Sequence, residues 1–304
     1  MYEITGLEKS DVSRMHFDVY AIVEGAQELY FGHEVQVNVN LVETVRVPVD
    51  GKVEGGTKST EKCYLSPTKR RGVERRSLIW APTADGQLLG DKLECGVPKT
   101  CAKQKCPICS VFGGLQTTKP QKTLVGRLVH GGGVAVQRLP PEEKQRAMHP
   151  SKIYKETEDN PSPFKRQYDQ PGLLFPVYNH CMSITDQEFQ AVAYAFLDAL
   201  ARIGAGNPKG VRIDTGLREG EPFLVVDRYL TPKGQRPVVS PSICEAEKAR
   251  QSFRESAFQV YGESDRNESM IEVENFTRRS GQEALRFLQE QADGFVNRVL
   301  NAKA

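Results

Sequence analysis

Four of the seven cysteines in this 304-residue chain lie in one short segment. The segment, residues 94–114, reads ECGVPKTCAKQKCPICSVFGG and contains Cys95, Cys101, Cys106 and Cys109. Cys106 and Cys109 form a CxxC pair, the spacing at which two thiolates chelate one tetrahedral zinc ion. Cys95 and Cys101 are close enough in sequence to supply the other two ligands. The spacing therefore predicts a structural zinc site.

Two other readings of the cysteines stay open. Cys106 and Cys109 flank Pro107, so they could be plain thiols in a buried turn. A redox-active CxxC pair is disfavoured, because no helical pattern clearly follows Cys106. Reserve metal ligands elsewhere in the chain are His130, His149 and Cys63.

Charge is segregated along the chain, although the net charge is only +2. From Cys95 to Pro141 there is no Asp or Glu, and the C-terminal third holds many of the acids. The acid-free stretch carries Lys99, Lys103, Lys105, Lys119, Lys122, Arg127 and Arg138. A surface with one basic side can bind phosphates while the protein stays soluble. We therefore expect Lys122 and Arg127 to contact nucleic acid.

A second basic cluster, KRRGVERR, precedes the cysteines. It contains Lys69, Arg70, Arg71, Arg75 and Arg76. If the segment is helical, Arg71 and Arg75 share one face, and arginine forks match phosphate oxygens. The plain alternative is a solvated basic face.

A glycine-rich segment, GAGNPKGVRI, follows the strongest helical pattern and offers Lys209 and Arg212. Glycines there would let an RNA backbone approach the chain closely. A simple helix-terminating turn explains the segment equally well.

The periodicity of the chain indicates an α+β protein. Residues 15–25 and the alternating segment 33–51 predict strands, and residues 50–70 read as a loop. Thr185 and Glu188 form a capping box before a helix, and two more helical patterns lie near the C-terminus. Residues 139–172 are polar and proline-rich, which predicts a projecting excursion. A ferredoxin-like or RRM-like sheet with large insertions, forming one domain over 1–304, fits this order.

Composition excludes several classes of protein. Hydrophobic residues make up 38% and charged residues 26% of the chain, which is typical of soluble globular proteins. No apolar run approaches the roughly 18–20 residues that span a bilayer, and the N-terminus lacks a signal-peptide core, so we expect a cytoplasmic protein. The five histidines are scattered, and no catalytic motif is recognisable.

The order of these features resembles the RAMP superfamily. CRISPR backbone subunits show the same features in the same order. These features are a first strand, a basic insertion, the cysteine cluster ending in CPICSVFGG, a long excursion, the segment PGLLFPVYNH, a helix and a Gly-rich loop. These subunits polymerise along the crRNA of Cascade-like effector complexes. The type I-D backbone subunit is most similar, and a type IV backbone subunit is the nearest competitor.

The resemblance implies a division of the chain and a role for each part. The RRM-like palm would carry a basic insertion over 50–92, a zinc-binding loop over 93–118, a thumb over 139–171 and a C-terminal helical extension over 216–304. The palm would hold the crRNA backbone while guide pairing reads sequence. The thumb would wedge into the guide–target duplex with Met148, Ile153, Tyr154 and Phe164, and Lys165 and Arg166 would contact its backbone.

One departure bears on catalysis. RNA-cleaving type III relatives use an Asp in the loop after the first strand, where this chain has Glu24, Glu28 and Glu34 but no Asp. We therefore expect no enzymatic activity. The expected partners are crRNA, a complementary target, copies of the chain and other effector subunits, acting in antiviral defence. A guide-dependent endoribonuclease and a stand-alone zinc-containing nucleic-acid-binding protein are the alternatives.

Overall fold

A computed structural model describes most of the chain, and for several outer strands it describes only the backbone. The described residues are 13–25, 27–29, 33–36, 39–53, 56–117, 120–138, 142–146, 164–204, 210–216, 220–262, 265–266 and 269–302.

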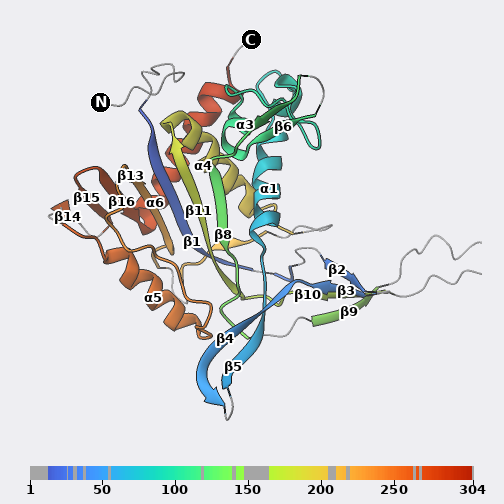
Figure 1. Ribbon diagram of the computed structural model, residues 1–304, viewed down its shortest axis with the longest axis vertical. Helices are drawn as coiled ribbons and strands as arrows, with labels where there is room; N and C mark the ends of the chain where they lie inside the picture. The colour runs from blue at the N-terminus through green and yellow to red at the C-terminus, as the bar shows by residue number, and fades with distance from the viewer. Residues whose placement is uncertain are drawn as a thin grey trace, which may run out of the picture.

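The main sheet is built around β1, Met15–Glu24. It pairs antiparallel with β11, Leu174–Ile184, on one side and with β13, Leu224–Tyr229, on the other (Figure 1). The sheet has eight strands in the order β14-β15-β16-β13-β1-β11-β8, with β12 paired to the end of β1. The other strands are β8 (Leu128–Gly132), β12 (Arg212–Ile213), β14 (Asp265–Arg266), β15 (Met270–Val273) and β16 (Phe276–Ser280).

Burial on both faces explains why β1 is almost continuously apolar. Phe17, Val19, Ala21 and Val23 alternate into the larger hydrophobic core. Tyr20 and Ile22 point the other way, into a second core that contains Phe253 of helix α5, Ala246–Phe258. The strand predicted at residues 15–25 is confirmed, and its second apolar face reflects a partner from late in the chain.

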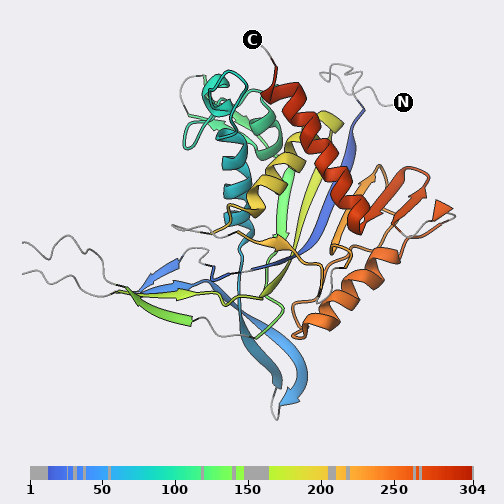
Figure 2. The ribbon, with the colours of Figure 1, turned by 180° about the vertical axis from the view of Figure 1, so that it is seen from behind.

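Helices cover both faces of the main sheet. On one face lie α1 (Pro67–Ile79), α4 (Asp186–Leu200) and α6 (Gly281–Phe295), which continues into a π-helical turn at Val296–Leu300 (Figure 2). On the other face lies α5 (Ala246–Phe258). The predicted capping box is confirmed: the Thr185 hydroxyl accepts from the Glu188 N–H at 3.0 Å, and the Glu188 carboxylate accepts from the Thr185 N–H at 2.9 Å. Within the described residues, no helix is both long and apolar enough to cross a membrane.

Three small sheets surround the main one. A four-stranded sheet has the order β2-β3-β10-β9, and the pairs β4-β5 and β6-β7 complete the set. Their bounds are β2 (His33–Gln36), β3 (Val39–Val42), β4 (Thr44–Val53), β5 (Gly56–Cys63), β6 (Gly114–Gln116), β7 (Lys122–Leu124), β9 (Glu142–Arg146) and β10 (Phe164–Tyr168). Strands β9 and β10, inside the predicted thumb, pair antiparallel with each other.

Two predictions for the N-terminal third are wrong. The alternating segment 33–51 is not one strand, because β2 and β3 pair antiparallel with each other and β4 follows separately. Residues 50–70, expected to be a loop, contain β5 and the start of α1. Pairing with β4 makes a strand of a segment whose own residues have low strand propensity.

The C-terminal part, 216–304, was predicted to be a helical extension. It contains α5 and α6, but it also supplies β13 to the centre of the main sheet and β14 to β16 to one side of it. The short apolar run that forms β13 has no periodicity of its own, since it is buried on both faces.

A buried carboxyl beside β10 provides a test of the fold. The N–H of Asp169 donates to the Leu29 carbonyl at 2.7 Å, and the N–H of Leu29 donates to the Asp169 carbonyl at 3.2 Å. Asp169 is fully buried, and this burial raises the pKa of its carboxyl to about 6. Because the folded pKa lies above the unfolded value of about 3.9, the ionised carboxylate destabilises the fold above pH 6. The cost disappears as pH falls towards 4.

We predict that Asp169→Asn raises the free energy of unfolding at pH 7.5 by up to roughly 3 kcal/mol, since about two pH units of pKa shift correspond to that amount. At pH 4 the same variant should match the parent. Urea unfolding at both pH values makes the comparison, and an equal effect at the two pH values would contradict the account.

Candidate metal centre and basic surface

The four clustered cysteines meet at one point. One ligand atom from each of Cys95, Cys101, Cys106 and Cys109 lies within 4.8 Å of the others. The Cys109 Sγ atom is 3.4 Å from Cys95 Sγ and 3.7 Å from Cys101 Sγ. All four thiols are free, and only Cys101 is partly exposed.

Local structure places these cysteines. Cys106 caps the short helix α3, Pro107–Phe112, and its Sγ accepts from the Cys109 N–H at 3.5 Å. Cys95 lies just beyond another short helix, α2, Leu89–Lys92. A helix therefore does follow Cys106, contrary to expectation. Since four thiols converge, however, the CxxC pair is not an isolated redox dithiol.

The distances fit a tetrahedral metal site. Four sulfurs at about 2.3 Å from one zinc ion lie about 3.8 Å apart, close to the separations seen here. A disulfide would need about 2.05 Å. Hydrogen bonds among the thiols lower the pKa of Cys95 and raise the pKa of Cys106. Thiolate is the form that binds metal, so metal binding would displace the protons that the other thiols keep.

The reserve ligands take no part in this site. The His130 side chain is buried against Glu74, with 2.8 Å between Nε2 and Oε2. Cys63 is buried outside the group of four, and His149 lies outside the described residues.

Helix α1 is fixed to the sheet by Arg70. Its guanidinium is buried and donates to the Gly131 carbonyl at 2.7 Å, the Tyr178 carbonyl at 3.1 Å and Asn179 Oδ1 at 3.2 Å. Glu74, one turn later, lies 3.9 Å from Arg70. Arg70 therefore does not face a nucleic-acid backbone, in contrast to our prediction, because it is buried and its two terminal nitrogens donate to groups of the protein itself.

Glu74 completes this buried network. Its Oε2 accepts from Asn179 Nδ2 at 2.9 Å and lies 2.8 Å from His130 Nε2. Burial alone would raise the pKa of the Glu74 carboxyl, but His130, Arg70 and Asn179 outweigh burial and lower it. The carboxylate thus stays ionised inside the protein.

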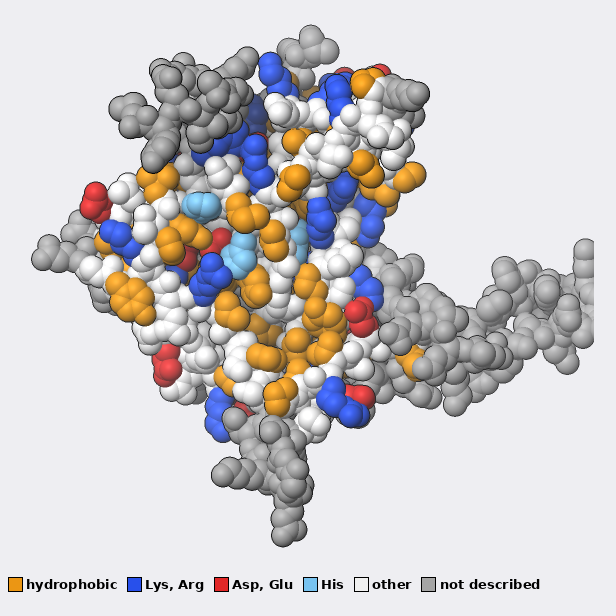
Figure 3. Space-filling view, viewed as in Figure 1, with side chains coloured by type: hydrophobic (Ala, Val, Ile, Leu, Met, Phe, Trp, Pro, Cys, Tyr) orange, Lys and Arg blue, Asp and Glu red, His pale blue; other side chains and the backbone are white. Residues whose placement is uncertain are grey.

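The other arginines of α1 point away from the sheet. Arg71 Nη2 donates to the Phe112 carbonyl, which ties α1 to the end of α3. Arg76 is exposed, and its guanidinium lies 5.9 Å from the centre of the Trp80 ring, which is itself 57% exposed. Lys69 forms an ion pair with Glu43. Figure 3 shows Lys and Arg side chains gathered over α1 and the loop above it.

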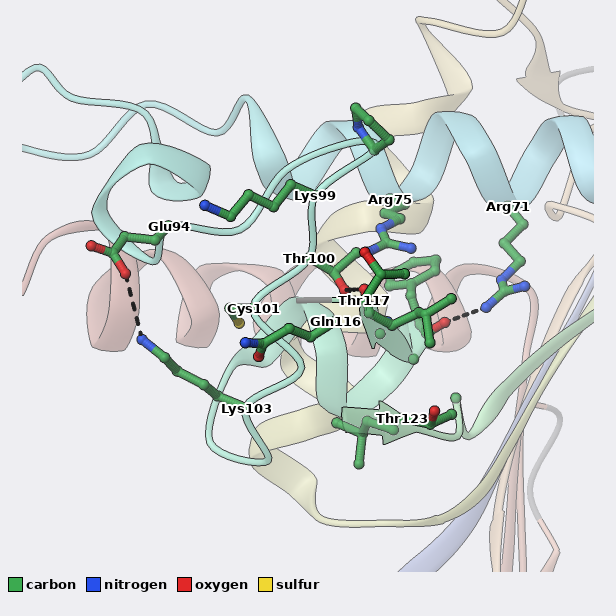
Figure 4. A pocket seen from close by; sticks show the side chains of 17 residues that line it. Arg71, Arg75, Glu94, Lys99, Thr100, Cys101, Lys103, Gln116, Thr117 and Thr123 are labelled. Carbon is green, nitrogen blue, oxygen red and sulfur yellow. Dashed lines mark hydrogen bonds and ion pairs between the residues drawn. The ribbon is translucent and has the colours of Figure 1, made fainter. Parts of the chain in front are cut away.

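A cavity of about 900 Å³ opens between α1 and the cysteine loop, residues 94–114 (Figure 4). Arg71, Arg75, Lys99 and Lys103 line it, and we call these four residues together with Arg76 the basic surface. Polar side chains of Thr100, Gln116, Thr117 and Thr123 also line the cavity. Sequence reasoning missed these residues, because β6 and β7 bring them together only in the fold.

The remaining predicted contacts are dispersed. Lys122 is exposed on β7. Arg127 lies 3.1 Å from Glu188, and Arg212 lies 2.9 Å from Glu24, so acids partly neutralise both arginines.

The predicted thumb contacts lie largely beyond what the structure describes. Phe164, Lys165 and Arg166 are on β10, where only the backbone is described; Lys165 stands opposite Val39 and Gln145. The other predicted thumb residues, Met148, Ile153 and Tyr154, lie outside the described residues. Lys209 of the Gly-rich loop lies outside them as well.

No family model matches the chain, and no curated protein matches its sequence. Among solved structures, the crystal structure of Csc2 from Thermofilum pendens is similar over 97% of this chain and 81% of that chain, with 14% identity and a TM-score of 0.45. A chain of a type IV-B CRISPR complex is similar over 67% of this chain and 92% of its own, with 14% identity and a TM-score of 0.40. Because both TM-scores lie below 0.5, we base the proposal that follows on the residues of this chain.

We predict that the purified protein holds about one zinc ion per chain, since four converging thiolates form a closed structural site. Cys109→Ser should remove most of this metal, whereas Cys244→Ser, outside the cluster, should retain it. Elemental analysis gives the metal content. Chelation should also speed tryptic cleavage after Lys99, Lys103 and Lys105, because the loop then loses its crosslink.

Proposed function

We propose that this chain is a backbone subunit of a CRISPR effector complex that binds the crRNA backbone. The observation that carries the proposal is the basic surface on α1 and the cysteine loop. The cysteine loop lies in the stretch from Cys95 to Pro141 that contains no acid. Glu94, just before it, is exposed and lies 3.9 Å from Lys103. Exposed cations with few nearby acids attract a polyanion.

The topology of the main sheet supports an RRM-like palm. Strands and helices follow the order β1-α1-β8-β11-α4-β13, ignoring insertions, and the strands lie in the order β13-β1-β11-β8 with antiparallel neighbours. This is the β-α-β-β-α-β pattern of ferredoxin-like folds. In this proposal the palm supports the basic surface and takes no part in reading bases, which guide pairing does.

The metal in this proposal is zinc, held by Cys95, Cys101, Cys106 and Cys109. When bound, it supplies a crosslink and no reaction chemistry. Ile108, Val111 and Phe112 anchor one end of this loop in the larger core. The crosslink would keep Lys99 and Lys103, in the other part, in place beside α1. A lysine-bearing loop held in one conformation loses less entropy on binding RNA than a free loop.

Trp80 offers a stacking platform beside the cations. It follows the last residue of α1 and is the only tryptophan of the chain. Exposed aromatic rings next to arginine bind unpaired bases without sequence preference. Binding of this kind suits a subunit that must hold any guide sequence. Copies of the chain along one guide, other effector subunits and a complementary target in antiviral defence complete the proposal.

The proposal includes no RNA cleavage by this chain. Glu24, the last residue of β1, forms an ion pair with Arg212. We predict that the assembled complex leaves labelled complementary RNA intact in the presence of Mg²⁺. A ladder of regularly spaced products on a gel would instead establish the endoribonuclease alternative.

We predict that single-stranded RNA quenches the fluorescence of Trp80 and binds with steep salt dependence. Replacing Arg76, Lys99 and Lys103 by Gln should lower the affinity at least roughly tenfold and reduce the slope of log K against log salt by about 2, since each lost contact removes about 0.7. Fluorescence anisotropy of labelled RNA measures both quantities.

The matched control replaces three exposed cations away from this surface, Arg202 just after α4, Lys248 on α5 and Arg286 on α6, by Gln. It changes net charge equally and should retain RNA affinity within about twofold. A parent protein whose binding does not respond to salt, or equal losses in the two triple variants, would refute the proposed surface.

A further inference from the structure

The cavity between α1 and the cysteine loop is lined by Arg75, two of whose nitrogens make no hydrogen bond to the described residues. The Nε and Nη2 atoms of Arg75 are buried from solvent, and neither has a hydrogen-bond partner among the described residues. Figure 4 shows the side chain extending from α1 towards Thr100 and Thr117. Buried nitrogens of a charged group that make no hydrogen bond are costly, because they have lost water without gaining a partner.

Two fully paired arginines of the protein show how this cost can be avoided. Arg278 bonds both oxygens of Asp227, at 2.7 and 2.6 Å. Arg250 bonds both oxygens of Asp214, at 2.8 and 2.9 Å. Among the described residues, Arg75 has no such carboxylate. An anion from outside the chain would supply what Asp227 and Asp214 supply elsewhere.

The rest of the cavity wall suits an oxyanion. Lys99 and Lys103 add positive charge, and Arg71 lines the same space. The one acid of the lining, Glu94, has a side chain that is 83% exposed and already lies against Lys103. Three threonines, Thr100, Thr117 and Thr123, are part of the lining.

The floor of the cavity is closely packed against the metal centre. A Cβ added at Gly114 would lie 2.9 Å from Cys109 Sγ, and one at Gly126 would lie 2.7 Å from the backbone of Phe112. Gly113, between them, has φ of +80°, which favours glycine. These close approaches leave little freedom to the backbone, so the cavity is preformed.

We infer that this cavity, the Arg75 pocket, binds the phosphate of a nucleotide, with the Arg75 guanidinium turning from its buried position to donate two parallel hydrogen bonds to it. The volume of about 900 Å³ lies within the range of about 300–1,000 Å³ typical of small-ligand sites, so it accommodates a whole nucleotide. Arginine forks match phosphate oxygens in this bidentate way. The inference deepens the proposed function. It rests on that function only where it takes the phosphate to belong to an RNA strand rather than to a free nucleotide.

A competing role for Arg75 exists within the protein. Zinc bound by four thiolates carries a net charge of −2, and Cys101 lines the same cavity. Arg75 would then be a counter-ion of the metal centre. In that case Arg75→Gln would lower zinc retention and leave nucleotide binding unaffected.

The test compares Arg75→Gln and Arg75→Lys with Arg286→Gln, an exposed arginine on α6, all in zinc-replete full-length protein. Binding of AMP, adenosine and single-stranded RNA is measured by calorimetry, with zinc content and thermal unfolding recorded for each variant. We expect AMP but not adenosine to bind the parent. Arg75→Gln should lower the affinity for AMP at least tenfold, and Arg75→Lys should lower it less. Arg286→Gln should change this affinity less than twofold.

The outcomes separate this inference from the proposed function. If AMP fails to bind, or binds Arg75→Gln as well as the parent, the pocket is refuted even when RNA binding persists. Zinc loss in Arg75→Gln with unchanged AMP affinity establishes the counter-ion role and also refutes the pocket. If AMP binding depends on Arg75 while RNA does not bind at all, the pocket stands and the proposed RNA role fails. If RNA affinity also falls in Arg75→Gln, the phosphate comes from the strand.

Discussion

One buried arginine, Arg70, fixes the position of the residues that are proposed to bind RNA and phosphate. Arg70 is enclosed by carbonyl groups at the edge of β8 and β11 and by the side chains of Asn179 and Glu74. Burial lowers the pKa of its guanidinium, but three acceptors and a carboxylate compensate for the lost water. With Arg70 turned inward, helical geometry turns Arg71 and Arg75 towards the cysteine loop.

Two sets of contacts hold the cysteine loop in place. On one side, Arg71 donates to the last carbonyl of α3. On the other, the four thiols converge within 4.8 Å of one another, and Ile108 and Phe112 of α3 pack into the larger hydrophobic core. The sheet, α1 and the loop therefore act as one rigid support, and the polar lining between them keeps its arrangement before a ligand arrives.

Sequence reasoning succeeded where a signal is local. The cysteine quartet, the capping box of Thr185 and Glu188, and β1 each have a pattern within 15 residues or fewer, and each is present. It failed where position depends on distant segments. Nothing in KRRGVERR distinguishes Arg70, whose acceptors lie more than 60 residues away, from its exposed neighbours. The lining of the cavity and the strand status of β13 arise from the same kind of long-range pairing.

The central strand is also the first part of the sheet to leave the ribosome. Tyr20 pairs with Val225, more than 200 positions later, so one edge of β1 stays unpaired while the rest of the chain is made. At roughly 5–20 residues per second, this interval is on the order of 10 to 40 seconds. An apolar strand with an open edge is prone to intermolecular association. Folding of the chain during translation therefore benefits from shielding of β1, which chaperones supply, and slower synthesis lengthens the interval over which that shielding is needed.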